Sequence, residues 1–118
     1  LPELWGLAEI IYGKERGVPP DTSRLLQNFP NPFNPETKIS YQLPEAGQVT
    51  LRVYNLLGAE VVTLHDGQIE AGQHQITWNG RNKFGSQVAS GMYLYRFEVQ
   101  ANQTGKRFVQ VRKMNLLR

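Results

Sequence analysis

Hydrophobic and polar residues alternate along much of the chain from residue 37 onward, and this period of two is typical of β-strands with one buried face. Short segments rich in Gly, Pro or Asn separate most of these rows and suit turns. Strands that recur roughly every 8 to 12 residues between turn signals are typical of a β-sandwich, so we predict an all-β fold. The row at 61–64 is expected to end at Asp66 and Gly67. The rows are 39–43, 49–53, 61–64, 74–78, 92–99 and 108–117.

Large apolar and aromatic side chains at the inward positions of these rows form the predicted core. Trp78 closes its row just before a turn at Asn79 and Gly80. A buried position suits so large a side chain, and a sugar-stacking platform is the alternative. Tyr93 and Tyr95 are expected to be core residues, or to anchor a strand by a hydrogen bond, in preference to forming a ligand-binding stripe. The predicted core residues are Leu51, Val53, Ile76, Trp78, Tyr93 and Tyr95.

Three prolines follow one another at short spacing in the segment QNFPNPFNP, residues 27–35, which we call the proline ribbon. Each proline lacks a backbone N–H and fixes φ, so this segment cannot lie in a helix or in a central strand. The residues before the prolines are pushed towards extended geometry. We therefore predict a stiff, extended ribbon, with Phe29 and Phe33 packed against an apolar surface.

Several blocks of the chain, spread from residue 26 to residue 118, match one known pattern in order. The blocks are 26–35 (LQNFPNPFNP), 39–44, 49–58, 71–74, 78–82 (WNGRN), 88–96 and 113–118 (KMNLLR). Together they resemble the type A C-terminal sorting domain of proteins exported by the type IX (Por) secretion system. That family is similar to the immunoglobulin-like domain of the flagellar hook-capping protein. The resemblance implies an immunoglobulin-like antiparallel β-sandwich of about seven strands.

The resemblance also implies a non-catalytic sorting function. In that family, an N-terminal cargo crosses the outer membrane because its C-terminal domain docks to the type IX translocon. A sortase-like peptidase commonly then removes the domain, and the upstream cargo domain of the same precursor is anchored or released. The implied localisation is the periplasm in transit, followed by the cell surface or the extracellular space.

Recognition of a sandwich needs an accessible edge, and β-augmentation is the usual physical route. We expect the last strand, within 107–118, to provide that edge. Lys113 and Arg118 would be polar anchors, whereas the apolar residues of the same segment would set the register by packing. The proline ribbon is either a cover for a sheet edge or a second element that the export machinery reads. The residues expected to contact the translocon are Lys113, Met114, Leu116, Leu117, Arg118, Asn31, Pro32 and Phe33.

The first 24 residues differ in kind from the rest. Apolar residues of 4–11 fall on one helical face, which predicts a short helix, or the end of an upstream domain, over 1–13. Residues 14–24 are expected to be a linker and to include the cleavage region at 17–23. Residues 25–118 form the predicted sorting domain. Because the sequence begins with Leu rather than Met, we expect it to be the tail of a longer precursor.

The net charge is only +3, but basic residues gather near the end of the chain, and no acidic residue follows Glu98. One interpretation is a solvated outer strand face. The other is a basic docking edge for an acidic partner or for anionic lipopolysaccharide. Nucleic acid is disfavoured as a partner because no binding motif accompanies the basic residues. No apolar run is long enough to span a membrane.

The chain offers little for catalysis or metal binding. Cysteine is absent, and the two histidines, His65 and His74, are too few and too separated for a typical zinc site. Asp66 follows His65 in a strand, so the two side chains point to opposite faces. Asn79 and Asn82 stand where the resembling family usually has aspartate, which argues against a calcium site there. We expect no cofactor, no metal and no enzymatic activity.

Two other classes of function stay open at this point. One is a structural spacer or a self-assembling surface module held together by edge pairing. The other is an accessory carbohydrate-binding module that would use Trp78.

Overall fold

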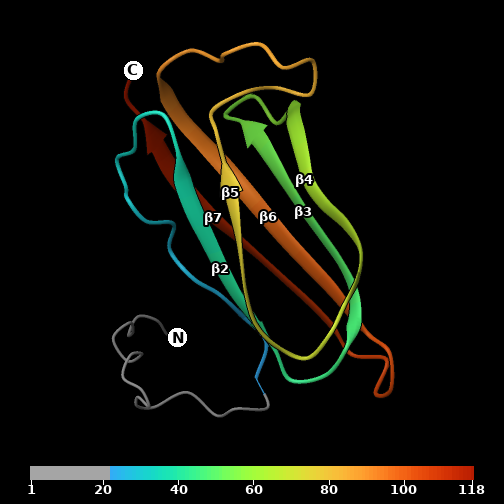
Figure 1. Cartoon of the computed structure of the whole chain (residues 1–118). Helices are drawn as coiled ribbons and strands as arrows, with labels where there is room; N and C mark the ends of the chain where they lie inside the picture. Colours follow the sequence, from blue (N-terminus) through green and yellow to red (C-terminus); the bar gives the residue numbers. More distant parts are fainter. Residues whose placement is uncertain (1–21) are drawn as a thin grey trace.

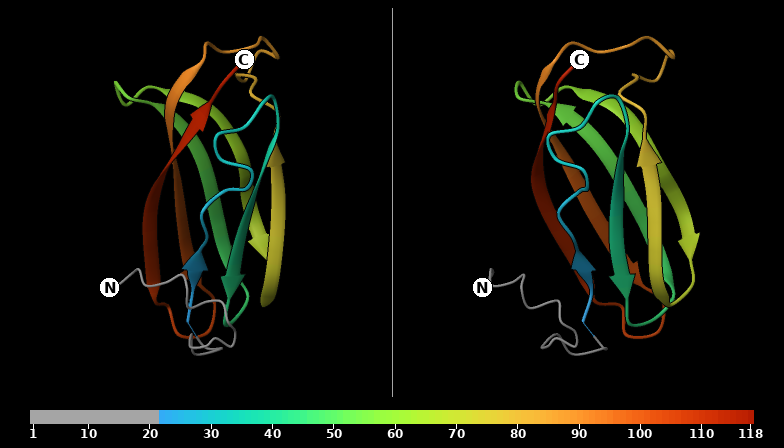
Figure 2. Two further views of the ribbon diagram at one scale, coloured as in Figure 1. Left: turned by 90° about the vertical axis from the view of Figure 1, so that its left-hand side faces the viewer. Right: turned by 60° about the vertical axis from the view of Figure 1, so that its left-hand side comes forward.

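The computed structural model describes residues 22–118, which form two β-sheets packed face to face (Figures 1 and 2). The first sheet has the strand order β1-β2-β5 and the second has the order β4-β3-β6-β7, with antiparallel pairing between neighbours. The predicted seven-stranded, all-β sandwich is therefore confirmed. The strands are β1 (Arg24–Leu25), β2 (Thr37–Leu43), β3 (Gly47–Asn55), β4 (Glu60–Ile69), β5 (Gly72–Trp78), β6 (Gly91–Ala101) and β7 (Arg107–Leu116).

The structure does not describe most of the predicted N-terminal segments. The helix or upstream-domain end expected over 1–13 and the linker up to residue 21 lie outside the described residues. Arg24, which the sequence placed at the end of the linker, lies in β1.

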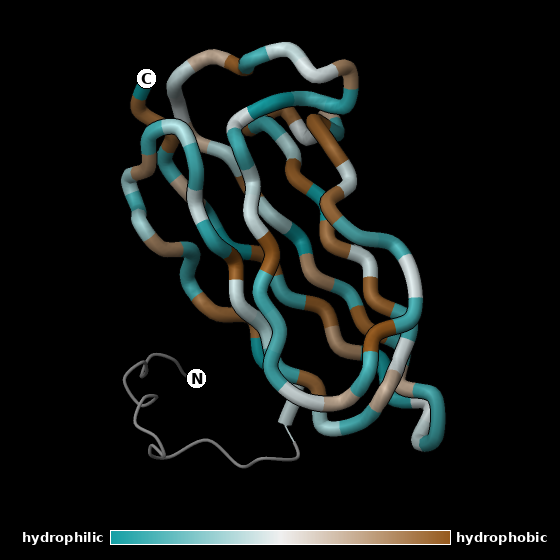
Figure 3. The backbone as a smooth tube through the Cα atoms, in the orientation of Figure 1, coloured by the Kyte–Doolittle hydropathy of each residue, from teal (hydrophilic) through white to brown (hydrophobic). Residues whose placement is uncertain are grey.

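The core lies between the two sheets and is built from the alternating rows. Figure 3 shows hydrophobic and hydrophilic residues alternating along the strands, and β2, β3 and β6 bury every second side chain. Of the six predicted core residues, only Ile76 is half-buried, while the other five are fully buried. Ile76 lies on β5, which is the edge strand of its sheet and pairs with β2 among the described strands. The side chain therefore has a neighbouring strand on one side and none on the other.

The fourth strand is longer than the sequence pattern predicts. Its expected end at Asp66 and Gly67 is wrong, because β4 continues to Ile69. The pairing with β3 persists through this region, where Val49 lies opposite Gly67 and Gly47 opposite Ile69. Gly67, which looks like the end of a strand in the sequence, is therefore a paired residue inside β4. Two register shifts interrupt the same β3–β4 pairing.

The proline ribbon crosses from one sheet to the other. Phe29 exchanges backbone hydrogen bonds with Lys38 of β2, and Phe33 bonds to the backbone of the β7 segment at Asn115 and Leu117. The Phe33 ring is buried and lies 5.6 Å from the Trp78 ring between centroids. The expectation that both phenylalanines pack inward is wrong for Phe29, which is 79 % exposed and lies opposite the exposed Lys38 in an isolated bridge.

A buried hydroxyl holds the start of this crossing in place. The Tyr95 hydroxyl on β6 accepts a hydrogen bond from the Asn28 backbone N–H at 2.8 Å and donates one to the Leu26 carbonyl at 2.8 Å. Burial raises the pKa of Tyr95 above its ordinary value, so the hydroxyl stays neutral. The expected strand-anchoring role of this tyrosine is therefore confirmed.

The substitution Tyr95→Phe removes both hydrogen bonds and leaves the buried Asn28 N–H without its partner. We expect the free energy of unfolding to fall by about 1–3 kcal/mol, measured as a lower midpoint in urea. Tyr54→Phe is the matched control, since the Tyr54 hydroxyl makes no hydrogen bond within residues 22–118, and it should leave the midpoint unchanged. Equal effects of the two substitutions would contradict the anchoring role.

Candidate functional site at the β7 edge

β7 is an edge strand of the four-stranded sheet and has β6 as its one strand neighbour. The β6–β7 pairing continues over ten residue pairs without a register shift. In an antiparallel ladder, alternate residues direct their backbone groups to the neighbour or away from it. The strand therefore has a regular row of outward-facing backbone groups, the kind of surface that sheet edges use in recognition.

The proline ribbon covers one half of this row, as Figure 2 shows by the course of residues 27–35 beside β7. The Asn115 carbonyl accepts from the Phe33 N–H at 3.0 Å, and the Leu117 N–H donates to the Phe33 carbonyl at 2.9 Å. Asn31 Oδ1 accepts from the Asn115 N–H at 2.9 Å, and Gln27 Nε2 donates to the Lys113 carbonyl at 2.8 Å. We call residues 113–117 the covered half of the edge.

No hydrogen bond from residues 22–118 covers the other half of the edge. Because Asn115 faces outward, the same parity directs the backbone groups of Arg107, Val109 and Val111 outward as well. Within the described part of the chain, these outward groups have no hydrogen-bond partner. The side chains of Val109 and Val111 are 38 % and 49 % exposed. We call residues 107–111 the open half of the edge.

The residues that the sequence predicted for recognition divide into two groups. Phe33, Met114 and Leu116 are buried in the core, so in the folded domain their contribution is to hold the ribbon and β7 in place. The accessible ones are Asn31, Pro32, Lys113, Leu117 and Arg118.

The expected polar anchor Arg118 is already engaged within the domain. Its Nε donates to the Val88 carbonyl at 2.6 Å, its Nη2 donates to the Gly80 carbonyl, and its backbone N–H donates to Ser90 Oγ at 2.9 Å. Gly80 has φ of +73°, and a Cβ at this position would lie 2.8 Å from Arg118 Nη2 and 3.1 Å from the Pro35 carbonyl oxygen. This glycine therefore makes room for the arginine.

The basic residues near the end of the chain are only partly neutralised. Glu98 pairs with Arg107 at 2.7 Å and with Arg96 at 2.8 Å. The hydrogen bond from Arg107, and after it the one from Arg96, holds the pKa of Glu98 below its ordinary value. Lys113 has no side-chain partner among residues 22–118, whereas Lys106 interacts electrostatically with the Glu45 carboxylate. These two ammonium groups flank the open half of the edge.

Other candidate sites are less suited to chemistry. Trp78 is 1 % exposed and donates through Nε1 to the Arg81 carbonyl, so the sugar-stacking interpretation of this residue is wrong. Asn79 and Asn82 accept backbone N–H groups of their own loop through Oδ1, as Asx turns do. No group of three metal-ligating side chains occurs within residues 22–118.

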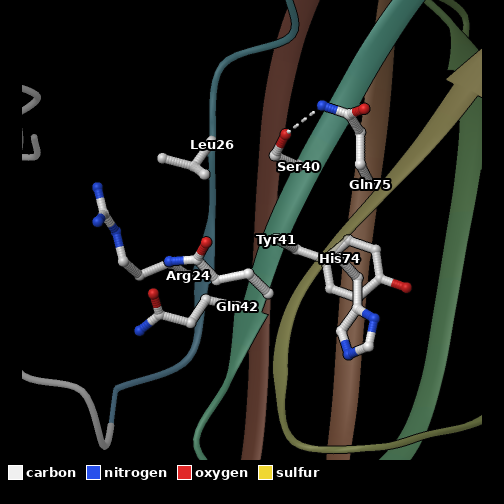
Figure 4. A pocket seen from close by; sticks show the side chains of 8 residues that line it. Arg24, Leu26, Ser40, Tyr41, Gln42, His74 and Gln75 are labelled. Carbon is white, nitrogen blue, oxygen red and sulfur yellow. Dashed lines mark hydrogen bonds between the residues drawn. The ribbon is translucent and has the colours of Figure 1, made fainter.

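A polar hollow lies on the outer face of the three-stranded sheet (Figure 4). Ser40 accepts a hydrogen bond from Gln75, and His74 Nε2 lies 2.7 Å from the Glu70 carbonyl oxygen, so these two side chains do not form a serine–histidine pair. Among residues 22–118, those lining this hollow include no carboxylate. No helix within residues 22–118 is long and apolar enough to cross a membrane.

The sandwich and its ribbon-covered edge define a small immunoglobulin-like domain. The FlgD Ig-like domain family matches residues 30–105, and the chain belongs to this family. No curated protein matches the chain.

Three solved structures are similar to the chain. Dimeric latent PorU from Porphyromonas gingivalis has 24 % identity and a TM-score of 0.64, over 86 % of this chain and 10 % of the PorU chain. FlgD from P. aeruginosa has 29 % identity and a TM-score of 0.50, over 68 % of this chain and 61 % of that one. FlgD from Xanthomonas campestris has 18 % identity and a TM-score of 0.57, over 80 % and 70 %. The chain thus corresponds to about a tenth of the length of PorU.

The open half of the edge is a part of the site that the sequence pattern alone does not single out. The signal in the sequence is the pair Val109 and Val111. Their side chains lie on the exposed face of β7, while the opposite face of the strand already carries the apolar residues Phe108, Met114 and Leu116. Apolar residues in both phases of an edge strand indicate a second contact surface.

The docking of Arg118 predicts different costs for two glycine substitutions. Gly80→Ala should lower the free energy of unfolding by about 1–2 kcal/mol for the left-handed backbone and further by displacing Arg118. Gly85→Ala has a similar φ of +83° but open space around it, so it carries the backbone cost alone. Urea unfolding of both variants measures the difference in their free energies of unfolding. When both are made in an Arg118→Ala background, this difference should become smaller. Equal destabilisation of the two variants would contradict the docking role.

Proposed function

We propose that the chain is a type A C-terminal sorting domain of the type IX secretion system, a non-catalytic domain that directs an upstream cargo across the outer membrane. One observation supports this proposal most strongly. The proline ribbon and residues 113–118, two distinctive blocks of the resemblance, come from opposite ends of the described chain. They meet in the fold through hydrogen bonds between Asn31 or Phe33 and the β7 segment.

The proposed partners are the type IX translocon and a sortase-like peptidase, with the cargo as the upstream part of the same precursor. The proposed route runs through the periplasm to the cell surface or the extracellular space. The similarity to PorU at 24 % identity supports the fold alone, so the sorting role rests on the sequence blocks and their meeting in the fold.

The accessible recognition residues make point substitutions a cleaner test than truncation. Removing 113–118 would take Met114 and Leu116 out of the core, and the cavity would cost several kcal/mol. Leu117 is 51 % exposed and Lys113 is exposed, so changing either one should leave the domain folded.

For the test, the 118-residue chain is fused behind a signal peptide and a fluorescent reporter, in a host with a working type IX system. The unaltered fusion should reach the surface or the medium. Leu117→Ser should reduce export about tenfold, which corresponds to a loss of about 1.4 kcal/mol of docking energy. Leu57→Ser is the matched control, since Leu57 is 95 % exposed on the β3–β4 turn, and it should be exported normally. Surface and medium fluorescence, with the mass of the product, gives the readout.

Periplasmic retention of the unaltered fusion, with the domain folded and intact, would overturn the sorting function. Normal export of Leu117→Ser would overturn the role of this residue in docking while leaving the sorting function in place.

A structural spacer or self-assembling surface module is the second candidate, and the FlgD Ig-like family match favours it. This function predicts concentration-dependent assembly of the purified chain in sedimentation experiments, whereas a sorting domain should stay monomeric.

A further inference from the structure

We propose that the open half of the β7 edge binds an extended segment of a partner protein as an added β-strand, and that this segment presents apolar and acidic side chains on the same face. The outward backbone groups of Arg107, Val109 and Val111 would supply the hydrogen bonds. The identity of the partner as a type IX component rests on the proposed function, but the binding surface itself does not.

The two edges of the four-stranded sheet are protected to different degrees. An edge strand can recruit foreign strands, and proteins usually blunt such edges with bulges or covering segments. The β4 edge has two register shifts, next to Leu51 and next to Val53 of its neighbour β3. The covered half of the β7 edge carries the proline ribbon. The open half has neither device within the described residues, since its pairing with β6 is regular and its outward groups have no partner.

The ribbon shows that this edge accepts an added segment. Phe33 pairs with Leu116 as a one-residue parallel bridge, with hydrogen bonds of 2.9 and 3.0 Å to the flanking residues. The last contact of the ribbon along the strand is Gln27 to the Lys113 carbonyl. An added strand would therefore occupy 107–111 and end where the ribbon begins.

The side chains of the open half specify the chemistry of the partner. Val109 and Val111 offer two exposed apolar contacts, and they lie opposite Glu98 and Arg96 of β6. Lys113 and Lys106 flank them: Lys113 has no side-chain partner in residues 22–118, whereas Lys106 also interacts electrostatically with the Glu45 carboxylate. Apolar residues next to ammonium groups favour a strand that presents apolar and carboxylate side chains on the same face, because charge complementarity steers association and fixes register.

The same charges disfavour a second copy of this chain as the occupant. If two open halves paired antiparallel with Val109 opposite Val111, Arg107 of each copy would lie opposite Lys113 of the other. Like charges directly opposite one another destabilise a strand pair.

A backbone substitution tests the added strand directly. Val111→Pro deletes an outward N–H, which no residue of 22–118 uses, and leaves the ladder bonds to β6 in place, as edge-strand prolines do. Val111→Ala is the matched control, because it shortens the side chain but keeps the N–H. The probe is a capped synthetic peptide of sequence Glu-Thr-Val-Thr-Val-Thr-Glu (the Glu–Val peptide), in which the Glu and Val side chains share one strand face. The same peptide with Lys for Glu (the Lys–Val peptide) is the charge control.

Titration of the isotope-labelled, full-length chain, followed by amide chemical shifts, gives the readout. With the Glu–Val peptide we expect shifts at 107–111, binding about tenfold weaker for Val111→Pro, and at most a small loss for Val111→Ala. The Lys–Val peptide should bind weakly or not at all. Val111→Glu keeps the N–H and adds a carboxylate between the two lysines, so it should weaken binding of the Glu–Val peptide relative to the Lys–Val peptide. This provides a second test if the proline variant folds poorly.

Several results would overturn the proposal. The Glu–Val peptide could fail to bind, could shift only amides in other parts of the domain, or could bind Val111→Pro and Val111→Ala equally. Concentration-dependent shifts at 107–111 in the absence of peptide would instead identify a second copy of the chain as the occupant. In the export assay, normal export of Val111→Pro beside a defective Leu117→Ser would overturn the identity of the edge partner as a type IX component and leave the sorting function in place. Peptide binding without export of the unaltered fusion would overturn the sorting function and leave the binding surface in place.

Discussion

The hydroxyl group of Tyr95 makes the contact on which the rest of the structure depends. It lies on β6 in the four-stranded sheet, yet it binds the backbone of Leu26 and Asn28, where the chain leaves the other sheet. A buried hydroxyl must have partners, so this contact fixes both the entry point and the direction of the proline ribbon. From there the ribbon runs beside residues 113–117, and its hydrogen bonds to this edge stop at the Lys113 carbonyl.

This crossing determines which surfaces the domain has left for a partner. The buried residues Phe33, Met114 and Leu116 hold the ribbon and β7 together, while exposed residues around them and the open half of the edge remain accessible. On the proposed function, the translocon would therefore read a folded surface and not a flexible tail. On the proposed function, a member of the FlgD Ig-like domain family would serve in sorting through the surface that it leaves open, because function on a shared fold comes from its sites.

Much of the fold could be predicted from the sequence because its signals are local. Period-two alternation identified the strands, and five of the six core residues are fully buried. Features that depend on tertiary contacts were predicted wrongly or not at all. Gly67 looks like the end of a strand, but pairing with Val49 carries β4 past it. Phe29 and Phe33 look alike in the ribbon, yet only Phe33 faces Trp78. The sequence placed recognition on the last strand, but it could not say which part of that strand the ribbon covers, because this depends on contacts between residues more than eighty positions apart.

Hydrogen exchange of the β7 backbone amides tests the central claim, that the ribbon divides this edge into a covered and an open half. The amides of Asn115 and Leu117 donate to ribbon oxygens, so they should exchange slowly although they face away from β6. The amides of Val109 and Val111 face the same way without a partner among residues 22–118 and should exchange much faster. This contrast between the two pairs would support the account. Equal protection of all four amides, or fast exchange at Asn115 and Leu117, would contradict it.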